Sequence, residues 1–303
     1  MAAVTPPERH YEVTHTATFT YPGPVASSYG RAVLLPRTVG GQVCHRSELR
    51  TDPAPAEIGE HRDYHGNRSS YFAVTDEHTR LRVVAESLVT VSRKASHPDR
   101  IPATNWEGVV HMARSLRSSG DQEHPDHAAS VIQVADGALA SPIVGSGSAA
   151  KEYATGSFTP GRHIGHVIRD LSERIHADFS CRGGATPAAA IGEVLSRRAG
   201  TGPDLAHVLV ACARAMGLAA RYVTGYVADR AGDARHAWAA IWVPHGGWVQ
   251  ADPANGRFVN ERYVLTGWGR DHADVSPLHG VAFADGDGPE LSVDVSLVEV
   301  EEP

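Results

Sequence analysis

Three segments of the sequence carry residue types that together could perform acyl transfer. A helix is predicted to begin at Gly202 and Pro203. Farther along the chain, His236 heads a strand-like run and Asp252 lies near the end of the next one. Thiol acyl transfer needs a cysteine at a helix N-terminus, a histidine within hydrogen-bond reach and a carboxylate that orients the histidine. A hairpin would bring His236 and Asp252 together, yet no cysteine lies at the helix start, so this spacing alone is a weak signal.

The elements that must position these residues are marked clearly in the sequence. Gly202, Pro203 and Asp204 suit the N-cap, N1 and N2 positions of a helix, and Gly217 is placed to end it. The apolar residues of this helix recur at helical spacing and are Leu205, Val208, Leu209, Cys212 and Met216. Strand-like runs follow over 220–228, 236–244 and 247–253, with a turn at 245–247. The pattern predicts a helix packed on an antiparallel sheet.

The first third of the chain predicts antiparallel β structure. Between residues 11 and 21, apolar residues and His15 alternate with Glu12 and threonines, which is the period of a half-buried strand. The segment "YPGP" is expected to break this strand. A second alternating run covers 81–91, and a Gly-Asn turn at 66–67 precedes another strand. Antiparallel strands joined by short loops favour a β-sandwich.

These patterns predict an α+β protein with two domains. Residues 1–95 are expected to form an N-terminal antiparallel β-sandwich, and 96–160 a connecting region of helix and loop. Residues 161–303 are expected to form the core, with a C-terminal β segment. Within the core, a further helix over 160–179 has its apolar residues at helical spacing: Ile164, Val167, Ile168, Leu171 and Ile175.

The charge, the apolar runs and the cysteine count of the chain argue against several classes of protein. The chain has 303 residues, a net charge of −7 and no cluster of basic residues, which argues against a nucleic-acid partner. No apolar run reaches the roughly 18–20 residues of a membrane span, and the first residues lack the apolar region of a secretory signal. We therefore expect a cytoplasmic protein without a membrane partner. The three cysteines are too few and too scattered for a disulfide framework or a zinc site.

The sequence resembles the bacterial transglutaminase-like proteins, members of the transglutaminase/papain-like superfamily that have their own N-terminal β domain. The resemblance covers nearly the whole chain. In the first domain it is carried by "YEVTHTATFTYPGPV", "LLPR", "DYHGN" and "HTRLRVVAESLVTV". In the core it is carried by "EVLSRRAGTGPDLAHVLVACARAMGLAARYVTGYV", "RHAWAAIWVPHGGWVQADPANG" and "VLTGWGRDHADVSPLHGV". It implies a papain-like core, with a helix packed on an antiparallel sheet.

The resemblance also locates the absent nucleophile. The family usually reads Gly-Val-Cys-Gln-Asp-Phe-Ala-His at the helix start, and this chain reads "GTGPDLAH" without a gap. The nucleophile position is therefore Gly202, and Pro203 stands where Gln is usual. The family's catalytic histidine and aspartate match His236 and Asp252. Since Pro203 has changed as well, we interpret the loss of the cysteine as natural.

Other residues could replace the thiol. Cys181 stands where the family usually has Tyr, beside Arg182, which would favour a thiolate; the alternative is a half-buried residue that fills the Tyr position. Thr201 could supply a hydroxyl, although a role in the cap or turn is favoured because an unactivated hydroxyl is a poor nucleophile. Cys212 is expected to pack as a small hydrophobe, and Cys44 is expected to lie far from the site.

The remaining candidates each have a structural alternative. His236 and Asp252 could persist as a hydrogen-bonded pair between strands instead of binding a ligand. His207 is expected to be packed or hydrogen-bonded. Two tryptophans, Trp238 and Trp248, are expected in the core or along the cleft. His272 stands where the family usually has Tyr. A cation beside His236 and Asp252, with His163 and His166 elsewhere in the domain, is a further alternative, but the spacing supports no particular metal.

Three functional hypotheses follow. The first is a pseudoenzyme that binds a peptide or partner protein through the former active-site cleft, without turnover and without cofactor or metal. The second is an active amidase, peptidase or acyl transferase on peptide amides that uses Cys181 or another nucleophile. The third is a structural module without a ligand. The sequence does not determine the substrate or the oligomeric state.

Overall fold

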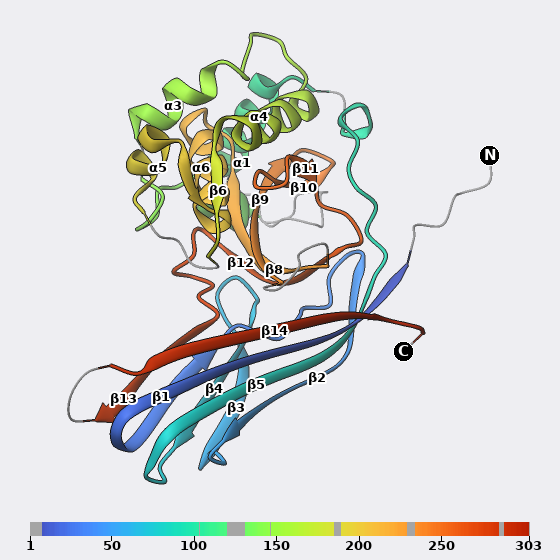
Figure 1. Ribbon diagram of the computed structural model, residues 1–303. Coiled ribbons are helices and arrows are strands. Elements are labelled where there is room, and N and C mark those ends of the chain that lie inside the picture. Colours follow the sequence, from blue (N-terminus) through green and yellow to red (C-terminus); the bar gives the residue numbers. More distant parts are fainter. Residues whose placement is uncertain are drawn as a thin grey trace.

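The chain forms an antiparallel β-sheet unit and an α+β core that packs against it (Figure 1). The computed structural model describes residues 8–102, 104–119, 131–145, 147–184, 189–228, 234–284 and 288–302. Residues 1–7 lie outside this range, and the expectation of no secretory signal depends partly on them. Residues 120–130 of the predicted connecting region also lie outside it. No helix among the described residues is long and apolar enough to span a membrane.

The first unit is a sheet of seven strands. They are β1 (Arg9–Ala32), β2 (Gln42–Asp52), β3 (Glu57–Arg62), β4 (Arg68–Val74), β5 (His78–Val91), β13 (Leu278–Ala284) and β14 (Glu290–Val300). The order β2-β5-β1-β4-β3 is extended by β13 and β14, which both pair with β1. The C-terminal segment, which the sequence analysis grouped with the core, therefore belongs to the first sheet.

A bend in the long strand β1 gives this sheet its curled shape. Its first half pairs with β5 and β14, and its second half pairs with β4 and β13. The register shifts between Thr20 and Val25, at the segment that was expected to break the strand. The strand bends there and continues, so all seven strands belong to one curled sheet (Figure 1). The predicted α+β class is confirmed, with a curled single sheet in place of two separate sheets.

The core is built on a five-stranded antiparallel sheet. Its strands run in the order β11-β10-β9-β8-β12 and are β8 (Ala220–Val227), β9 (Arg235–Val243), β10 (Gly247–Asp252), β11 (Arg257–Phe258) and β12 (Tyr263–Gly269). A short parallel ladder joins β6 (Ser180–Arg182) and β7 (Ala199–Thr201). The predicted turn between β9 and β10 is present, with His245 and Gly247 at positive φ.

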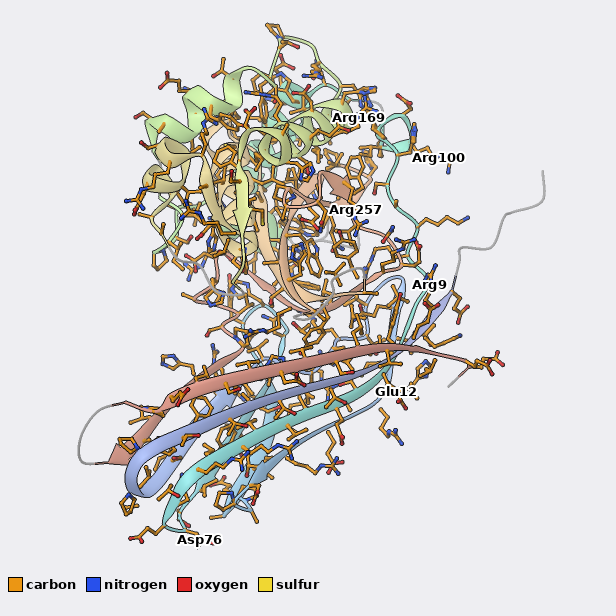
Figure 2. The ribbon with its side chains drawn as sticks, in the orientation of Figure 1. Arg9, Glu12, Asp76, Arg100, Arg169 and Arg257 are labelled. Carbon is orange, nitrogen blue, oxygen red and sulfur yellow. The ribbon has the colours of Figure 1, made fainter. Side chains whose placement is uncertain are left out.

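Helices pack against this sheet and fill much of the upper part of the molecule (Figure 1). They are η1 (Pro98–Arg100), α1 (Trp106–Ser119), α2 (Val131–Gly137), α3 (Ser148–Thr155), α4 (Ile164–Asp178), α5 (Ile191–Arg197) and α6 (Gly202–Ala215). Residues of the predicted connecting region, such as Val109 and Ala154, are buried in the same cluster as α4 and α6. Figure 2 labels Asp76, in the β4–β5 turn at the lower end of the first unit, and Arg169, on α4 among the helices of the core.

α6 is the central helix of the core. The sequence predicted one apolar stripe, but every residue from Gly202 to Ala213 is buried, because the helix packs against β9, β8 and three other helices. Gly217 follows the helix at φ +89°, a conformation that suits glycine, and it ends the helix as predicted. Full burial fixes the position of the helix start against the sheet.

Two side-chain amides join the units. The amide of Gln42 donates to the carbonyl of Leu265 and accepts from its N–H, both at 2.8 Å. The amide of Asn67 does the same with Trp268, at 2.8 and 2.9 Å. Both target residues lie on β12, an edge strand, whose outer backbone groups are thus satisfied by the first unit. The segment "DYHGN", seen in the sequence as a turn, therefore also holds the two units together.

Candidate functional site

His236 and Asp252 meet at the paired ends of β9 and β10. His236 Nε2 lies 2.7 Å from Asp252 Oδ2, and the two side chains are 1% and 0% exposed. A carboxylate only accepts hydrogen bonds, so Nε2 carries the proton and donates it. This bond holds the imidazole in one orientation, as the orienting carboxylate of an acyl-transfer site does.

The Asp252 carboxylate has a full set of donors. Tyr263 Oη and Asn255 Nδ2 both donate to Oδ2 at 2.6 Å, and the backbone N–H groups of Ala254 and Asn255 donate to Oδ1. Burial alone would raise the pKa of Asp252, but His236 and these hydrogen bonds together bring it below its ordinary value. Asp252 is therefore ionised at neutral pH.

The nucleophile position faces the other side of the imidazole. A Cβ placed on Gly202 would lie 3.4 Å from His236 Cε1 and 3.5 Å from Nδ1, which is ordinary van der Waals contact. An atom one bond farther out could come within hydrogen-bond reach of Nδ1. The structure thus brings Gly202, His236 and Asp252 together in the order that an acyl-transfer triad requires, and their roles in catalysis stay a prediction.

α6 begins at Gly202 as predicted, but its N-cap lies one residue earlier than expected, and the cap role that the sequence favoured for Thr201 is confirmed. Thr201, and not Gly202, is the N-cap: its Oγ1 accepts from the Asp204 N–H at 3.3 Å, while its own N–H donates to Asp204 Oδ2 at 2.8 Å. This reciprocal pair is a capping box, which satisfies backbone donors that glycine at the N-cap would leave without a side-chain partner. Gly202 is therefore the first residue inside the helix, where the dipole would favour a thiolate.

A small cleft lies beside His236, between the two units. Its volume is about 20 Å³. Its walls include Tyr222, Arg235 and His236 from the core and His15, Val33 and Leu34 from the first unit. His15 Nδ1 also lies 3.0 Å from the hydroxyl of Tyr226, which ties this wall to β8.

The three cysteines lie in different surroundings. Cys181 is exposed on β6 and pairs with Gly200 in the β6–β7 ladder, two residues before Gly202. Cys212 is buried in α6, and burial raises the pKa of its thiol to about 12. Cys44 lies on β2 in the first unit. Cys181 therefore lies on a strand that pairs with the segment leading into the helix start.

Of the two tryptophans considered in the sequence, one lies at the site. The ring of Trp238 stacks beside His236 with centroids 6.3 Å apart, and its Nε1 donates to Gln250 at 2.8 Å. Trp248 instead stacks on Arg221, with the guanidinium carbon 4.3 Å from the ring centroid. Trp238 thus forms part of the wall behind the imidazole.

His207 is packed inside the core, as expected. It is 1% exposed, stacks on Tyr222 with centroids 4.5 Å apart, and its Nε2 accepts from the backbone N–H of His272 at 3.1 Å. The ring of His272 in turn packs edge-on against Tyr222. Burial lowers the pKa of His207 to about 4, so the ring is neutral at physiological pH.

Because His207 is buried in its neutral form, the chain is expected to lose stability in mild acid. The pKa of His207 is lower in the folded chain than in the unfolded chain, so the unfolded state binds the proton first as the pH falls below about 6.5. The free energy of unfolding is expected to fall by about 3 kcal/mol between pH 6.5 and 4 from this group. Urea unfolding of the parent and of His207→Gln at several pH values measures it. The unfolding free energy of His207→Gln should fall less between pH 6.5 and 4 than that of the parent, whereas the exposed control His61→Gln should behave like the parent. The same fall in all three proteins would contradict the assignment.

The two histidines of the metal alternative, His163 and His166, have other partners in the structure. His163 caps α4 through Nδ1, which accepts from Gly165 N–H, and His166 pairs with Asp99 at 2.9 Å. Within the described parts of the chain, no group of three or more His, Cys, Asp or Glu residues is arranged to hold a metal ion.

Sequence reasoning missed two residues of the site. Asn255 and Tyr263 both donate to the Asp252 carboxylate, and Asn255 Nδ2 also lies 3.4 Å from His236 Nε2. Asn255 could have been found from its place three residues after Asp252, which is typical of a turn closed by side-chain hydrogen bonds. Tyr263 comes from β12, on the far side of β8 from β9, and no local pattern points to it.

Comparison with known families agrees with this architecture. Residues 11–90 match the family described as the bacterial transglutaminase-like N-terminal region. Residues 151–253, which hold Gly202, His236 and Asp252, match the transglutaminase-like superfamily. The two matches correspond to most of the first sheet and to the part of the core that holds the site.

Relatives and solved structures extend the comparison to the whole chain. The uncharacterized protein Rv2569c of Mycobacterium tuberculosis is 38% identical over 96% of this chain and 93% of its own. The uncharacterized protein ML0607 of Mycobacterium leprae is 26% identical over 89% of this chain and 91% of its own. A solved structure from Cytophaga hutchinsonii, provisionally assigned as a cysteine protease, has a TM-score of 0.73 at 16% identity and covers 98% of this chain and 92% of that one. The chain belongs to the transglutaminase-like superfamily, in the group that carries the bacterial transglutaminase-like N-terminal region.

Proposed function

We propose that this chain is a transglutaminase-like pseudoenzyme that binds a peptide segment of a partner protein beside His236 without turning it over. The observation that carries the proposal is the contrast between the buried His236–Asp252 pair and Gly202, which faces it without a side chain. A covalent acyl intermediate needs a nucleophilic atom at this position. The histidine that would act as the base and the aspartate that would orient it are both present, but the attacking atom is absent. This combination favours binding over catalysis. A cytoplasmic location stays a prediction.

The cleft limits what can reach His236. A volume of about 20 Å³ corresponds to little more than one water-sized group. A bound peptide would therefore lie across the opening and present one small polar group, such as a glutamine amide or a lysine amine, to the imidazole. Arg235 lines the same opening and could hold the peptide backbone. Neither a cofactor nor a metal enters the proposal.

Peptide binding without turnover is the direct test. Fluorescence anisotropy would be measured for labelled tetrapeptides that carry Gln, Lys or Ala at one position, with parallel assays for ammonia release and cleavage. We expect the Gln or Lys peptide to bind more tightly than the Ala peptide, with no ammonia and no cleavage products. Turnover by the parent chain would contradict the proposal. Equal, negligible binding of all three peptides would favour a structural module instead.

A blocking variant tests where the peptide binds. Gly202→Leu places a large side chain against His236, so binding of the preferred peptide should be lost. Gly192→Leu is the matched control, because a Cβ at Gly192 meets nothing within 4 Å and Gly192 lies on α5. His236→Ala should also weaken binding, by removing the group that the peptide meets. Binding that survives both site variants would mean that the peptide docks elsewhere.

One observation favours a second candidate, an amide-bond enzyme that uses Cys181. The parallel β6–β7 ladder places Cys181 opposite Gly200, next to the strand that leads into α6. Arg182 follows it in sequence and would favour a thiolate. In this case the thiol would attack from β6 instead of from the helix start.

Thiol labelling separates the two candidates. In the pseudoenzyme, Cys181 should react with iodoacetamide at the rate of an ordinary exposed thiol, and His236→Ala should not change that rate. Burial raises the pKa of Cys212 to about 12, so Cys212 should stay unmodified, and Cys44→Ser removes the other background site. Fast labelling of Cys181 that slows severalfold in His236→Ala would instead support the second candidate.

A further inference from the structure

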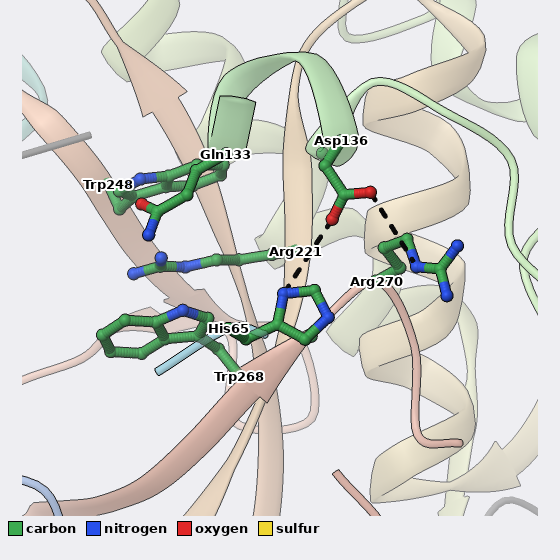
Figure 3. A pocket seen from close by; sticks show the side chains of 9 residues that line it. His65, Gln133, Asp136, Arg221, Trp248, Trp268 and Arg270 are labelled. Atoms are coloured by element: carbon green, nitrogen blue, oxygen red, sulfur yellow. Dashed lines mark ion pairs between the residues drawn. The ribbon is translucent and has the colours of Figure 1, made fainter. Parts of the chain in front are cut away.

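Arg221 has a buried guanidinium held between two tryptophan rings. Its Cζ lies 3.8 Å from the ring centroid of Trp268 and 4.3 Å from that of Trp248, and the residue is 8% exposed. Figure 3 shows the planar group between the rings, in a pocket that α2 borders through Gln133 and Asp136. Cation–π contacts of this kind stabilise a desolvated arginine, but they supply no hydrogen-bond acceptor.

This arginine has no acceptor among the residues that the structure describes. No hydrogen bond or ion pair from these residues reaches its side chain, and the Nε atom is fully buried without a partner. The indole Nε1 of Trp248, in the same pocket, is a second buried donor without an acceptor. Burial, with Arg37 nearby, lowers the pKa of Arg221 well below its ordinary value. An unpaired buried cation costs several kcal/mol, so a missing anion is the natural complement.

The pocket's own carboxylate does not fill this role. Asp136 lies 3.9 Å from His65 Nδ1 and 4.0 Å from Arg270 Nε. Figure 3 shows both of these pairs on the opposite side of the pocket from the guanidinium of Arg221. Arg37 covers the other face of Trp268, with its Cζ 3.6 Å from the ring, and so adds a second positive charge near Arg221. The surroundings of Arg221 are therefore positive.

We propose that this pocket binds a carboxylate, with Arg221 as its anchor. A guanidinium presents parallel N–H groups that match the two oxygens of a carboxylate, and Trp248 Nε1–H adds a third donor. The cavity is only about 10 Å³, so a small flat group at the end of a chain, such as a carboxylate, reaches the guanidinium more readily than a bulkier phosphate. The carboxylate could belong to a free small acid or to the C-terminus of a peptide. This site lies apart from the His236 cleft and does not depend on the peptide-binding proposal.

Acetate titration tests the proposal. Tryptophan fluorescence and melting temperature of the full chain would be followed against sodium acetate, acetamide and sodium chloride, the salts being compared at equal ionic strength. We expect a saturable response to acetate that acetamide and chloride do not produce. A tetrapeptide with a free C-terminal carboxylate, beside its amidated form, separates a peptide ligand from a free acid. A response shared equally by acetate, acetamide and chloride would overturn the proposal.

Variants identify the anchor. Arg221→Met keeps the apolar stem between the rings and should weaken acetate at least tenfold, while Arg169→Met on α4 should leave the response unchanged. Trp248→Phe keeps a ring against Arg221 and removes only the Nε1–H, so it should weaken acetate severalfold even if Arg221→Met does not fold. An acetate response that is unchanged in Trp248→Phe and in any folded Arg221→Met protein would overturn the assignment.

Discussion

The Gly202→Cys variant is expected to hydrolyse peptide amides that the parent chain leaves intact. A Cβ at Gly202 meets His236 at ordinary contact distance, so the cysteine needs no rearrangement of the imidazole. The helix dipole at the first position of α6 and a proton acceptor at His236 Nδ1 should both favour the thiolate. A covalent nucleophile is worth several orders of magnitude in rate, so a gain of about a thousandfold or more over the parent is expected.

The measurement is an assay of ammonia release and amine incorporation on a panel of peptide amides. Gly202→Ala is the matched control, because it adds the same Cβ without the thiol. Gly202→Cys combined with His236→Ala should be as silent as the parent, since the thiol then has no base. Pro203→Gln, added to Gly202→Cys, restores the residue that is usual in the family and should not lower the rate.

Each outcome of the Gly202→Cys assay discriminates between the functional hypotheses. Turnover by Gly202→Cys alone means that His236 and Asp252 are in working geometry and that one missing atom silences the chain. Turnover already present in the parent would refute the pseudoenzyme proposal and make Cys181 the first suspect. If neither protein turns over, the cleft beside His236 has changed beyond the nucleophile, and a structural role becomes the better account.

The core of the fold could be predicted because its signals are local. The apolar periodicities of α4 and α6, and the runs that became β8, β9 and β10, lie in short continuous segments. The N-cap of α6 was placed one residue late, at Gly202, although a cap role was also favoured for Thr201 and its spacing from Asp204 carries the capping signal. The glycine at Gly202 was read as a cap because glycine is accepted there, but a hydroxyl forms the hydrogen bond that glycine cannot.

What could not be predicted depends on pairing between distant segments. The C-terminal strands β13 and β14 join β1, more than two hundred residues away, and period-two alternation does not say which strand a segment will join. The same limit applies to the surroundings of Arg221, which come from three strands of the core and a turn of the first unit. Family resemblance supplied the partners of the triad, but not Asn255 and Tyr263, which complete the carboxylate's hydrogen bonds.

Replacement of Asp252 by alanine is expected to destabilise the chain by about 3–5 kcal/mol, because it leaves several buried donors without an acceptor. The donors are the ring N–H of His236, the amide of Asn255 and the hydroxyl of Tyr263. Asp252→Asn keeps the shape and one acceptor oxygen, so its loss should be smaller, at about 1–2 kcal/mol. Asp76→Ala, in the exposed β4–β5 turn, is the control and should stay within about 0.5 kcal/mol of the parent.

The pH dependence of the same variants distinguishes a charged Asp252 from a merely well-packed one. The pKa of Asp252 is lower in the folded chain than in the unfolded chain, so its contribution is complete above pH ~4 and is lost as the pH falls further. The difference in unfolding free energy between parent and Asp252→Ala, measured in urea, should therefore narrow below pH ~4 and stay constant above it. His207 is present in both proteins, so its titration cancels in this difference. A difference in unfolding free energy that stays the same down to pH 3 would mean that Asp252 acts through packing. The His236–Asp252 pair would then owe little of its stability to the carboxylate charge.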